Sequence, residues 1–342
     1  MRAAVYKGDR RVEVEDLPVP ALGPRDVLVE VAHCGICGSD LHFVLDGWSP
    51  PNRVHGHEWV GRIAAVGDAV VRWRPGDLVV GGPRPACGTC GPCRSGRPNL
   101  CQGRAAVGED DPGLGAFAEY VLAADDALLA LPEGLDPRAG ALAEPLAVAL
   151  HGIRQGRVRA GQRVLVTGAG PIGALSIAVL RHGGVVDVTC SEPVPARRDL
   201  AGRLGARVCH PDELEAPRSP NAVVAEPFDV ALECSGRAEA MEQALGQLGR
   251  AGTLVLVGAG MGRPRFDPNR ILLNELVVTG AFTYDPDGFE QALRLLADPG
   301  FPTDVLLEPG DVPLDALGDA IAALGAGRIA GKVLVTPGRF RS

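Results

Sequence analysis

The chain has 342 residues, 46% of them hydrophobic, and carries a formal net charge of −8. This length predicts two domains with sizeable cores. The acidic balance and the lack of a dense Lys/Arg cluster exclude nucleic acid as a partner, and no apolar run is long enough for a transmembrane helix.

The N-terminus runs directly into strand-like sequence, without the long apolar segment of a signal peptide. We therefore expect a cytoplasmic protein that has no membrane partner. Nine cysteines in such a chain are more typical of metal sites than of disulfides.

The first third of the chain is predicted to be rich in β-structure. Residues 12–15 and 27–31 alternate apolar and polar side chains, and prolines break the chain between them. The same pattern resumes at 60–67 and 77–80, where Gly-Asp and Pro-Gly-Asp sequences supply turns. We expect an irregular β-rich domain, either a barrel or a folded sheet.

Two short stretches between these strands carry candidate chemistry. Cys37, His57 and Glu58 offer a thiolate, an imidazole and a carboxylate, which are ligand types that zinc accepts. Ser39 and His42 add a hydroxyl and a second imidazole. Together they provide what alcohol oxidation needs, a Lewis acid and a route for the proton. The competing interpretation, a buried cysteine with no function, is weakened by two further motifs.

Four cysteines with characteristic spacing follow in the segment 87–101, namely Cys87, Cys90, Cys93 and Cys101. Three thiols at intervals of three residues, with a fourth shortly after, can surround one tetrahedral ion. Four sulfur ligands leave no open position, so the pattern predicts a structural zinc site. Disulfides or free surface thiols are the alternative, which a reducing compartment disfavours.

After a further strand-like segment at 116–124, residues 139–151 are predicted to form a helix that is interrupted at Pro145. Glu144 precedes this proline in an otherwise apolar run. An acidic side chain in such a place should be paired or should bind a metal.

At residue 163 the pattern becomes that of a nucleotide-binding fold. The apolar strand 163–167 is typical of a parallel sheet that is covered on both faces. The G-x-G-x-x-G sequence follows: Gly168 allows a tight turn, Gly170 lets a pyrophosphate approach the backbone, and Gly173 lets helix and strand pack closely. The alternative is an ordinary tight turn between strand and helix.

The rest of the predicted coenzyme site lies around this loop. Pro171 and Ile172 begin the helix whose N-terminus faces the phosphates. Glu192 ends the next strand, about 20 residues on, where an acidic side chain meets the adenosine ribose. Its charge should repel a 2′-phosphate and favour NAD. Arg197 and Arg198 are close enough to soften that repulsion, so NADP remains possible.

Strands and helices then alternate along the chain, which predicts a doubly wound parallel sheet. Residues 289–297 form an amphipathic helix pattern and 332–335 a last strand. We predict a catalytic zinc domain at 1–146 that includes the lobe 87–101, a dinucleotide-binding domain at 147–288, and a return to the catalytic domain at 289–342.

These motifs together resemble the zinc-dependent medium-chain dehydrogenase/reductase family, and within it the sorbitol, idonate and butanediol dehydrogenase branch. The resemblance covers essentially the whole chain. It implies an α/β fold with an N-terminal β-rich GroES-like catalytic domain and a Rossmann domain of doubly wound parallel sheet. The active site is then expected in the cleft between them.

By position, the resemblance implies that Cys37 and His57 bind a catalytic zinc. Glu144 falls where sorbitol-type enzymes place a glutamate ligand, and Glu58 corresponds to a carboxylate that can approach the same ion. Asp40 resembles the acid that orients the ligating histidine. Ser39 and His42 resemble the proton relay, and the four cysteines of 87–101 the structural lobe.

The resemblance thus implies reversible hydride transfer between NAD and a secondary alcohol of polyol, sugar or sugar-acid type. It implies two zinc ions per chain, one catalytic and one structural, a small alcohol or ketone as substrate, and a homodimer or homotetramer. Two alternatives are a zinc-independent double-bond reductase of the same fold and a non-catalytic nucleotide-binding protein. The intact ligand set disfavours the first, and the intact relay disfavours the second.

Overall fold

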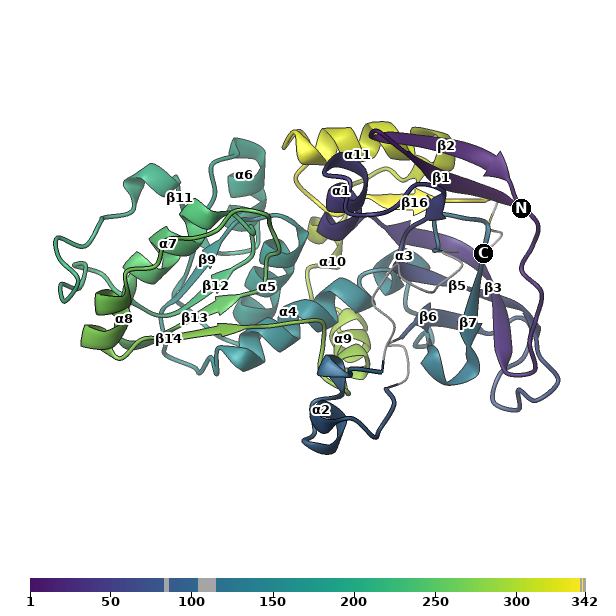
Figure 1. The fold of residues 1–342 in the computed structure, drawn as a ribbon, viewed down its shortest axis with the longest axis horizontal. Helices are drawn as coiled ribbons and strands as arrows, with labels where there is room; N and C mark the ends of the chain where they lie inside the picture. Colours follow the sequence, from purple (N-terminus) through teal and green to yellow (C-terminus); the bar gives the residue numbers. More distant parts are fainter. Residues whose placement is uncertain (83–85, 104–114, 339, 341–342) are drawn as a thin grey trace.

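The computed structural model describes residues 1–82, 86–103, 115–338 and 340. Two large sheets lie side by side along the long axis of the molecule, with α4 (Ala143–Gln155) between them (Figure 1). One apolar cluster runs from Val60 in the first sheet through Leu146 of α4 to Val166 in the second. Within the described residues, no helix is long and apolar enough to cross a membrane.

The coenzyme-type sheet is parallel throughout, with the strand order β11-β10-β9-β12-β13-β14. This is the doubly wound arrangement that the alternating pattern predicts, so the expected α/β fold is confirmed. The strands are β9 (Val164–Thr167), β10 (Val188–Ser191), β11 (Arg207–Cys209), β12 (Phe228–Glu233), β13 (Leu248–Leu256) and β14 (Val277–Gly280).

Helices cover both faces of this sheet because successive strand residues point to opposite sides. Val164 and Val166 pack in one cluster with Leu175 of the helix that follows β9, whereas Leu165 packs in another with Ala244. The helices on this half are α5 (Pro171–His182), α6 (Pro195–Arg203), α7 (Ala238–Gly246) and α8 (Pro268–Asn274).

The other large sheet is mixed and has the order β15-β16-β3-β5-β6-β8, with β7 also paired to β3. Its strands are β3 (Asp26–Gly35), β5 (Glu58–Val66), β6 (Leu78–Gly81), β7 (Tyr120–Ala124), β8 (Leu128–Ala130), β15 (Val312–Pro313) and β16 (Leu334–Thr336). A smaller sheet joins β1 (Arg2–Gly8), β2 (Arg11–Asp16) and β4 (Arg53–Val54).

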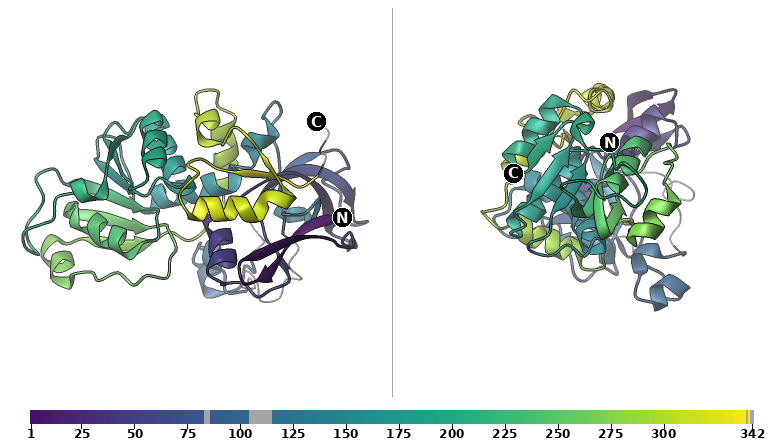
Figure 2. Two further views of the ribbon diagram at one scale, coloured as in Figure 1. Left: turned by 90° about the horizontal axis from the view of Figure 1, so that it is seen from above. Right: turned by 90° about the vertical axis from the view of Figure 1, so that its left-hand side faces the viewer.

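The chain returns to this half at its C-terminal end, as Figure 2 shows for the yellow segment. β16 pairs antiparallel with β3, with Leu334 opposite Gly35. The sheet therefore includes the last strand that the pattern predicts, while the exact domain boundaries stay a prediction. The remaining helices are α1 (Gly38–Leu45), α2 (Gly91–Arg94), α3 (Pro137–Gly140), α9 (Gly288–Leu296), α10 (Thr303–Leu306) and α11 (Leu317–Gly325).

The predicted helix over 139–151 is interrupted at residues 141–142, between α3 and α4, and not at Pro145. Pro145 lies in the first turn of α4, which runs on to Gln155. A proline is tolerated there because the first N–H groups of a helix have no intrahelical partner. Glu144 is consequently held in the same first turn, at the junction of the two sheets.

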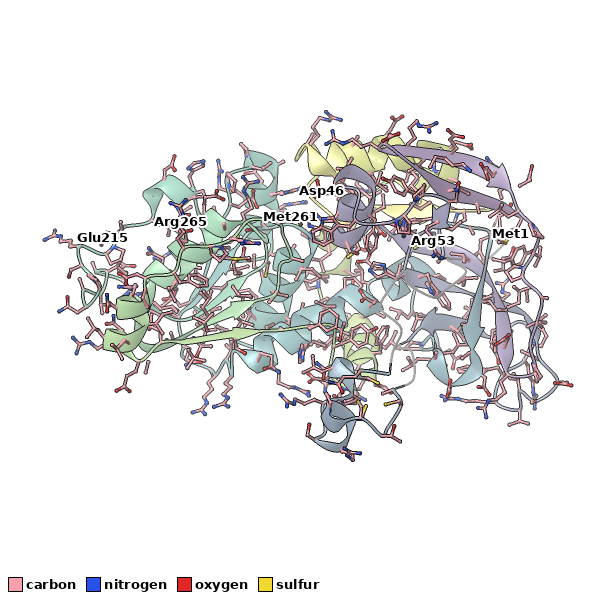
Figure 3. All side chains as sticks on the ribbon, in the orientation of Figure 1. Met1, Asp46, Arg53, Glu215, Met261 and Arg265 are labelled. Atoms are coloured by element: carbon pink, nitrogen blue, oxygen red, sulfur yellow. The ribbon has the colours of Figure 1, made fainter. Side chains whose placement is uncertain are left out.

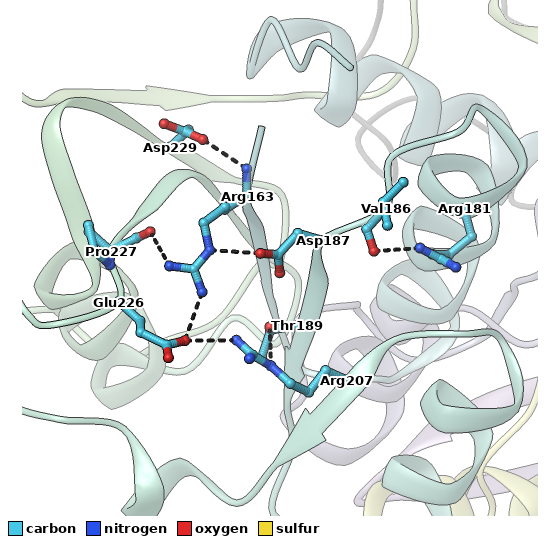
Figure 4. A network of polar contacts seen from close by, with 9 residues as sticks. All are labelled: Arg163, Arg181, Val186, Asp187, Thr189, Arg207, Glu226, Pro227 and Asp229. Atoms are coloured by element: carbon cyan, nitrogen blue, oxygen red, sulfur yellow. Dashed lines mark hydrogen bonds and ion pairs between the residues drawn. The ribbon is translucent and has the colours of Figure 1, made fainter. Parts of the chain in front are cut away.

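A network of charged side chains joins the beginnings of the parallel strands (Figure 4). The backbone N–H of Arg163 donates to Asp229, and its guanidinium donates to Asp187 and Glu226 at 2.8 and 3.0 Å. Arg207 donates to Thr189 beside it. These contacts lie at the opposite end of β9 from the glycine loop, so their role is to hold the strands in register.

Candidate active site

Three possible metal ligands come together where β3 ends and β5 begins. Cys37, His57 and Glu58 each place one donor atom within 4.8 Å of the other two. The antiparallel register sets Gly35 opposite Glu58, so the two sequence stretches meet at the same end of the strand pair. Cys37 is the N-cap residue of α1.

Two positions beside this cluster, Gly35 and Gly56, have no space for a side chain. Gly56 has φ +96°, and a Cβ there would lie 2.9 Å from Cys34 Sγ and from the backbone N of Phe117. A Cβ on Gly35 would overlap Glu58 Oε2. Both positions therefore exclude larger residues, the first also because positive φ disfavours them.

Asp40 stands behind the predicted ligands and is fully buried. Its Oδ2 accepts the backbone N–H of Cys37 at 2.8 Å, and its Oδ1 lies 4.0 Å from Nδ1 of His57. This Oδ1 has no hydrogen-bond partner among the described residues. Burial raises the pKa of Asp40. A carboxylate in this place can orient a metal-binding histidine through the ring nitrogen that is not bound to the metal.

The electrostatics of the cluster fit a cation. Removal from water lowers the pKa of His57, but Cys37, Asp40 and Glu144 outweigh it, so the pKa of His57 is raised. Burial raises the pKa of Glu144 to about 7, and Glu58 adds to this effect. Several acidic groups thus share a small volume. A thiolate, an imidazole and carboxylates are a donor set that zinc accepts.

Lys332 is a member of this cluster that sequence reasoning missed. Its Nζ lies 2.7 and 2.6 Å from the two carboxylate oxygens of Glu58 and donates to the carbonyl of Ile36 at 3.0 Å. Lys332 and Glu58 are almost completely removed from water, with 2% and 0% of their side chains exposed. No motif surrounds Lys332 in the sequence, so only the pairing of β16 with β3 reveals it.

The predicted third ligand, Glu144, is not a member of the three-residue group. Its carboxylate is nevertheless close enough to His57 to contribute to the raised pKa of that ring. The structure therefore brings Glu58 to the cluster more directly than Glu144. Which of the two binds the metal stays a prediction.

The two predicted relay side chains lie on α1. Ser39 Oγ is buried and has no hydrogen-bond partner among the residues described. The ring of His42 has Asp46 Oδ2 at 2.6 Å from Nδ1 and the carbonyl oxygen of Ala259 at 3.1 Å from Nε2. His42 therefore touches both halves of the molecule, and the unpaired hydroxyl of Ser39 can still form a hydrogen bond with a substrate oxygen.

The predicted structural lobe is also assembled. The sulfur atoms of Cys87, Cys90, Cys93 and Cys101 lie within 4.8 Å of one another. Hydrogen bonds from Thr89 and from the N–H of Cys90 lower the pKa of Cys87 to about 5. The described cysteines form no disulfide. Four converging sulfurs, one of them readily ionised, fit a closed zinc site.

The glycine loop connects β9 to α5 as the coenzyme prediction requires. Gly168 has φ +86°, and a Cβ on Gly173 would overlap the carbonyl oxygen of Gly168. A Cβ on Gly170 would meet nothing within 4 Å, so the backbone there faces open space. Pro171 is the first residue of α5, and Ile172 follows it. The helix N-terminus and the open backbone suit a phosphate group.

Glu192 is buried beside this loop, where both of its carboxylate oxygens are engaged. Oε2 accepts the N–H of Ala169 at 2.7 Å, and Oε1 accepts the N–H of Val194 at 2.8 Å. The side chain therefore braces the loop. Each oxygen has a second lone pair, so it can also accept a ribose hydroxyl.

The two arginines that follow Glu192 donate hydrogen bonds to backbone carbonyls of the protein. Arg197 donates to the carbonyls of Leu324 and Ile329, which belong to the C-terminal segment. Arg198 donates to the carbonyls of Glu192 and Pro193. Arg197 thus links the two halves of the molecule in this structure, and its predicted cofactor contact stays a prediction.

Comparisons with known proteins agree on one family. The family model described as "Alcohol dehydrogenase GroES-like domain" matches residues 23–133, and the one described as "Zinc-binding dehydrogenase" matches residues 171–298. The chain is 37% identical to L-threonine 3-dehydrogenase of Anaeromyxobacter sp. (strain K), over 78% of this chain and 79% of that protein.

Solved structures resemble it along nearly the whole length. The 2R,3R-butanediol dehydrogenase from Bacillus subtilis has a TM-score of 0.85 and 32% identity, with 98% of this chain and 99% of that chain covered. A protein from Sinorhizobium meliloti 1021, described as a zinc-binding dehydrogenase bound to NADP, has a TM-score of 0.85, 33% identity and the same coverage.

Proposed function

This chain belongs to the zinc-binding dehydrogenases of the alcohol dehydrogenase family, and we propose that it transfers hydride reversibly between NAD and a secondary alcohol of the polyol type. The observation that carries the proposal is the convergence of Cys37, His57 and Glu58 beside the unpaired hydroxyl of Ser39. A dehydrogenase needs a polarising cation and a nearby proton acceptor, and this place offers residues for both.

In this mechanism the residues of the chain position the reactants and move the proton. A zinc held by Cys37, His57 and a glutamate would supply the Lewis acid that polarises the substrate oxygen. Asp40 is placed to orient the His57 ring, because its carboxylate lies on the Nδ1 side at 4.0 Å. Ser39 Oγ accepts the alcohol proton as it leaves and passes it outward toward His42.

The coenzyme supplies the hydride acceptor, and the protein holds it in place. The N–H groups at the start of α5 and the open backbone at Gly170 would receive the coenzyme phosphates, while Glu192 holds the loop through the N–H of Ala169. A zinc held by the four lobe cysteines would have no open position. The lobe is therefore structural rather than catalytic.

The substrate class follows from chemistry that two relatives share. L-threonine and 2R,3R-butanediol, named for the relatives above, each carry a secondary hydroxyl next to a carbon with another polar group. We infer the same feature in the substrate of this chain. The test is reduction of NAD by the zinc-loaded protein with L-threonine, 2R,3R-butanediol, sorbitol, an aldonate and 2-propanol. Turnover of 2-propanol alone would overturn the polyol assignment, and no turnover of any would overturn the function.

We expect a preference for NAD over NADP of about tenfold or more, because a buried carboxylate at Glu192 repels a 2′-phosphate. The measurement is kcat/KM with each coenzyme and one alcohol. Glu192→Gln should narrow the ratio, while Glu226→Gln, a change to an exposed glutamate at the other end of the sheet, should not. The Sinorhizobium protein is described as bound to NADP. If the parent enzyme had the higher kcat/KM with NADP, Glu192 would not discriminate between the two coenzymes.

Glu144→Gln tests the choice of carboxylate ligand. If Glu144 binds zinc, the uncharged amide should lower both zinc content and turnover, by about tenfold or more in turnover. Metal analysis and steady-state rates on the same sample measure the two effects, and Glu133→Gln on the exposed surface is the control. Unchanged zinc and unchanged turnover would make Glu58 the better ligand candidate.

We also propose that the chain assembles as a homodimer or homotetramer. Within the described part of the chain, β14 pairs with β13 alone, so its other edge is open. Large apolar side chains are exposed on this strand and beside it, at Leu272, Leu273, Val277 and Phe282. An open edge with apolar neighbours invites pairing with a second copy about a two-fold axis.

The proposed compartment is the cytoplasm. The lobe cysteines are unpaired in the structure, and they can bind a metal only while they remain reduced. The reducing environment of the cytoplasm keeps such thiols reduced.

A further inference from the structure

The ring of His42 is clamped between two oxygen atoms from different parts of the molecule. Asp46, four residues further along the chain, approaches Nδ1 at 2.6 Å, and the carbonyl of Ala259 lies 3.1 Å from Nε2. Ala259 follows β13 in the coenzyme half. Figure 3 places Asp46 and Met261, two residues after Ala259, where the two halves of the molecule meet.

This geometry restricts where protons can sit on the ring. An ionised carboxylate and a backbone carbonyl only accept hydrogen bonds. With Nδ1–H donated to Asp46, the neutral ring keeps its free lone pair on Nε2, the nitrogen that faces the coenzyme half. When Nε2 takes up a proton, the resulting imidazolium makes both hydrogen bonds that the structure shows.

Two further features of the structure lie next to the ring. The indole of Trp48 stacks on the imidazole, with centroids 4.3 Å apart and planes 12° from parallel. His42 is in the last turn of α1, and the helix C-terminus attracts a cation. Other titratable groups beside α1 include Arg10, which donates to the carbonyl of Leu45, and the exposed Asp319 of α11. His55 stacks on Phe43 of α1, and Asp40 is buried in the first turn of the helix.

We propose that Asp46 is a positioning residue of the proton path. Its carboxylate fixes the Nδ1–H tautomer of His42, so that Nε2 is the proton acceptor, and it stabilises the imidazolium that forms. When the alcohol O–H bond breaks, its proton forms the Nε2–H bond, and water later takes the same proton from Nε2. A bound NAD would accept the electron pair of the alcohol C–H bond as hydride. The side chain of His42 is itself 24% exposed, so water can reach the ring.

The inference rests on the proposed function for its catalytic meaning, but its first test needs no turnover. A protonated imidazole quenches the fluorescence of a stacked indole. Trp48 is 40% exposed, whereas Trp59 and Trp73 are buried at 9% and 6%. Emission of the zinc-loaded protein without coenzyme is recorded between about pH 5 and 8. Trp48→Phe should remove the pH-dependent part of the signal.

Asp46→Asn should move the quenching transition to lower pH by about one unit or more, because the amide keeps the shape but removes the charge. Asp319→Asn, which changes an exposed acid on the neighbouring helix, should leave it in place. Alcohol oxidation by Asp46→Asn should fall about tenfold in kcat near neutral pH with an unchanged KM, since Asp46 does not touch substrate. Asp46→Glu should recover part of the rate.

The two readouts separate the possible failures. If the protein oxidises no alcohol but the transition depends on Asp46, the proposed function fails and the Asp46–His42 pair stands. If the protein oxidises alcohols and Asp46→Asn matches the parent in both transition and pH profile, the inference is overturned. A lower rate with an unmoved transition also overturns it, because the effect is then structural.

Discussion

Cys37→Ala is expected to lower alcohol oxidation by roughly a thousandfold or more while the fold stays intact. Cys37 is the thiolate of the three-residue cluster, and the polarising cation contributes several kcal/mol to the transition state. The lobe and both apolar cores lie elsewhere, so they should not change. Steady-state rates and metal analysis on one preparation measure the effect, with zinc expected to fall from about two ions per chain to about one.

The matched control is Cys34→Ala. Cys34 is a buried cysteine near the end of β3, three residues before Cys37, and is not part of the ligand group. It should keep both zinc ions and most of the activity. A parent protein with a single zinc that Cys37→Ala retains would refute the catalytic site, because that zinc would then belong to the lobe.

Lys332→Met is expected to destabilise the protein by about 3–5 kcal/mol, because it leaves a buried carboxylate without its counter-charge. Glu58 has 0% of its side chain exposed, and the ammonium group of Lys332 donates to both of its carboxylate oxygens. The freed carboxylate is also next to Cys37 and His57, where it can occupy the metal. Urea unfolding of parent and variant measures the stability change, and turnover of the folded variant measures the second effect.

Lys7→Met is the control for this prediction, since it breaks an ion pair with Glu15 that is partly exposed to water. Its effect should be within about 1 kcal/mol. The double variant Glu58→Gln, Lys332→Met should recover much of the lost stability because no unpaired charge remains. If Lys332→Met unfolded at the same urea concentration as Lys7→Met, the buried pair would not stabilise the fold.

The sequence by itself determined the features whose chemistry depends on local spacing. The four cysteines of the lobe need only short turns between them to converge, so their spacing predicts the cluster that the structure shows. The glycine loop is equally local, because Gly168 and Gly173 are required by a turn and a close contact within the same few residues. The strand and helix patterns predicted the parallel sheet, since its buried strands must be apolar on both faces.

Only the tertiary structure decided which distant side chains complete the active site. Lys332 reaches Glu58 across 274 positions of sequence, because β16 lies beside β3. The contact of His42 with Ala259 spans 217 positions and joins the two halves. Arg197 was assigned to the coenzyme by its place near Glu192, yet it donates to the C-terminal segment. Such partners are chosen by packing and charge pairing in space, and no periodicity or motif along the chain records them.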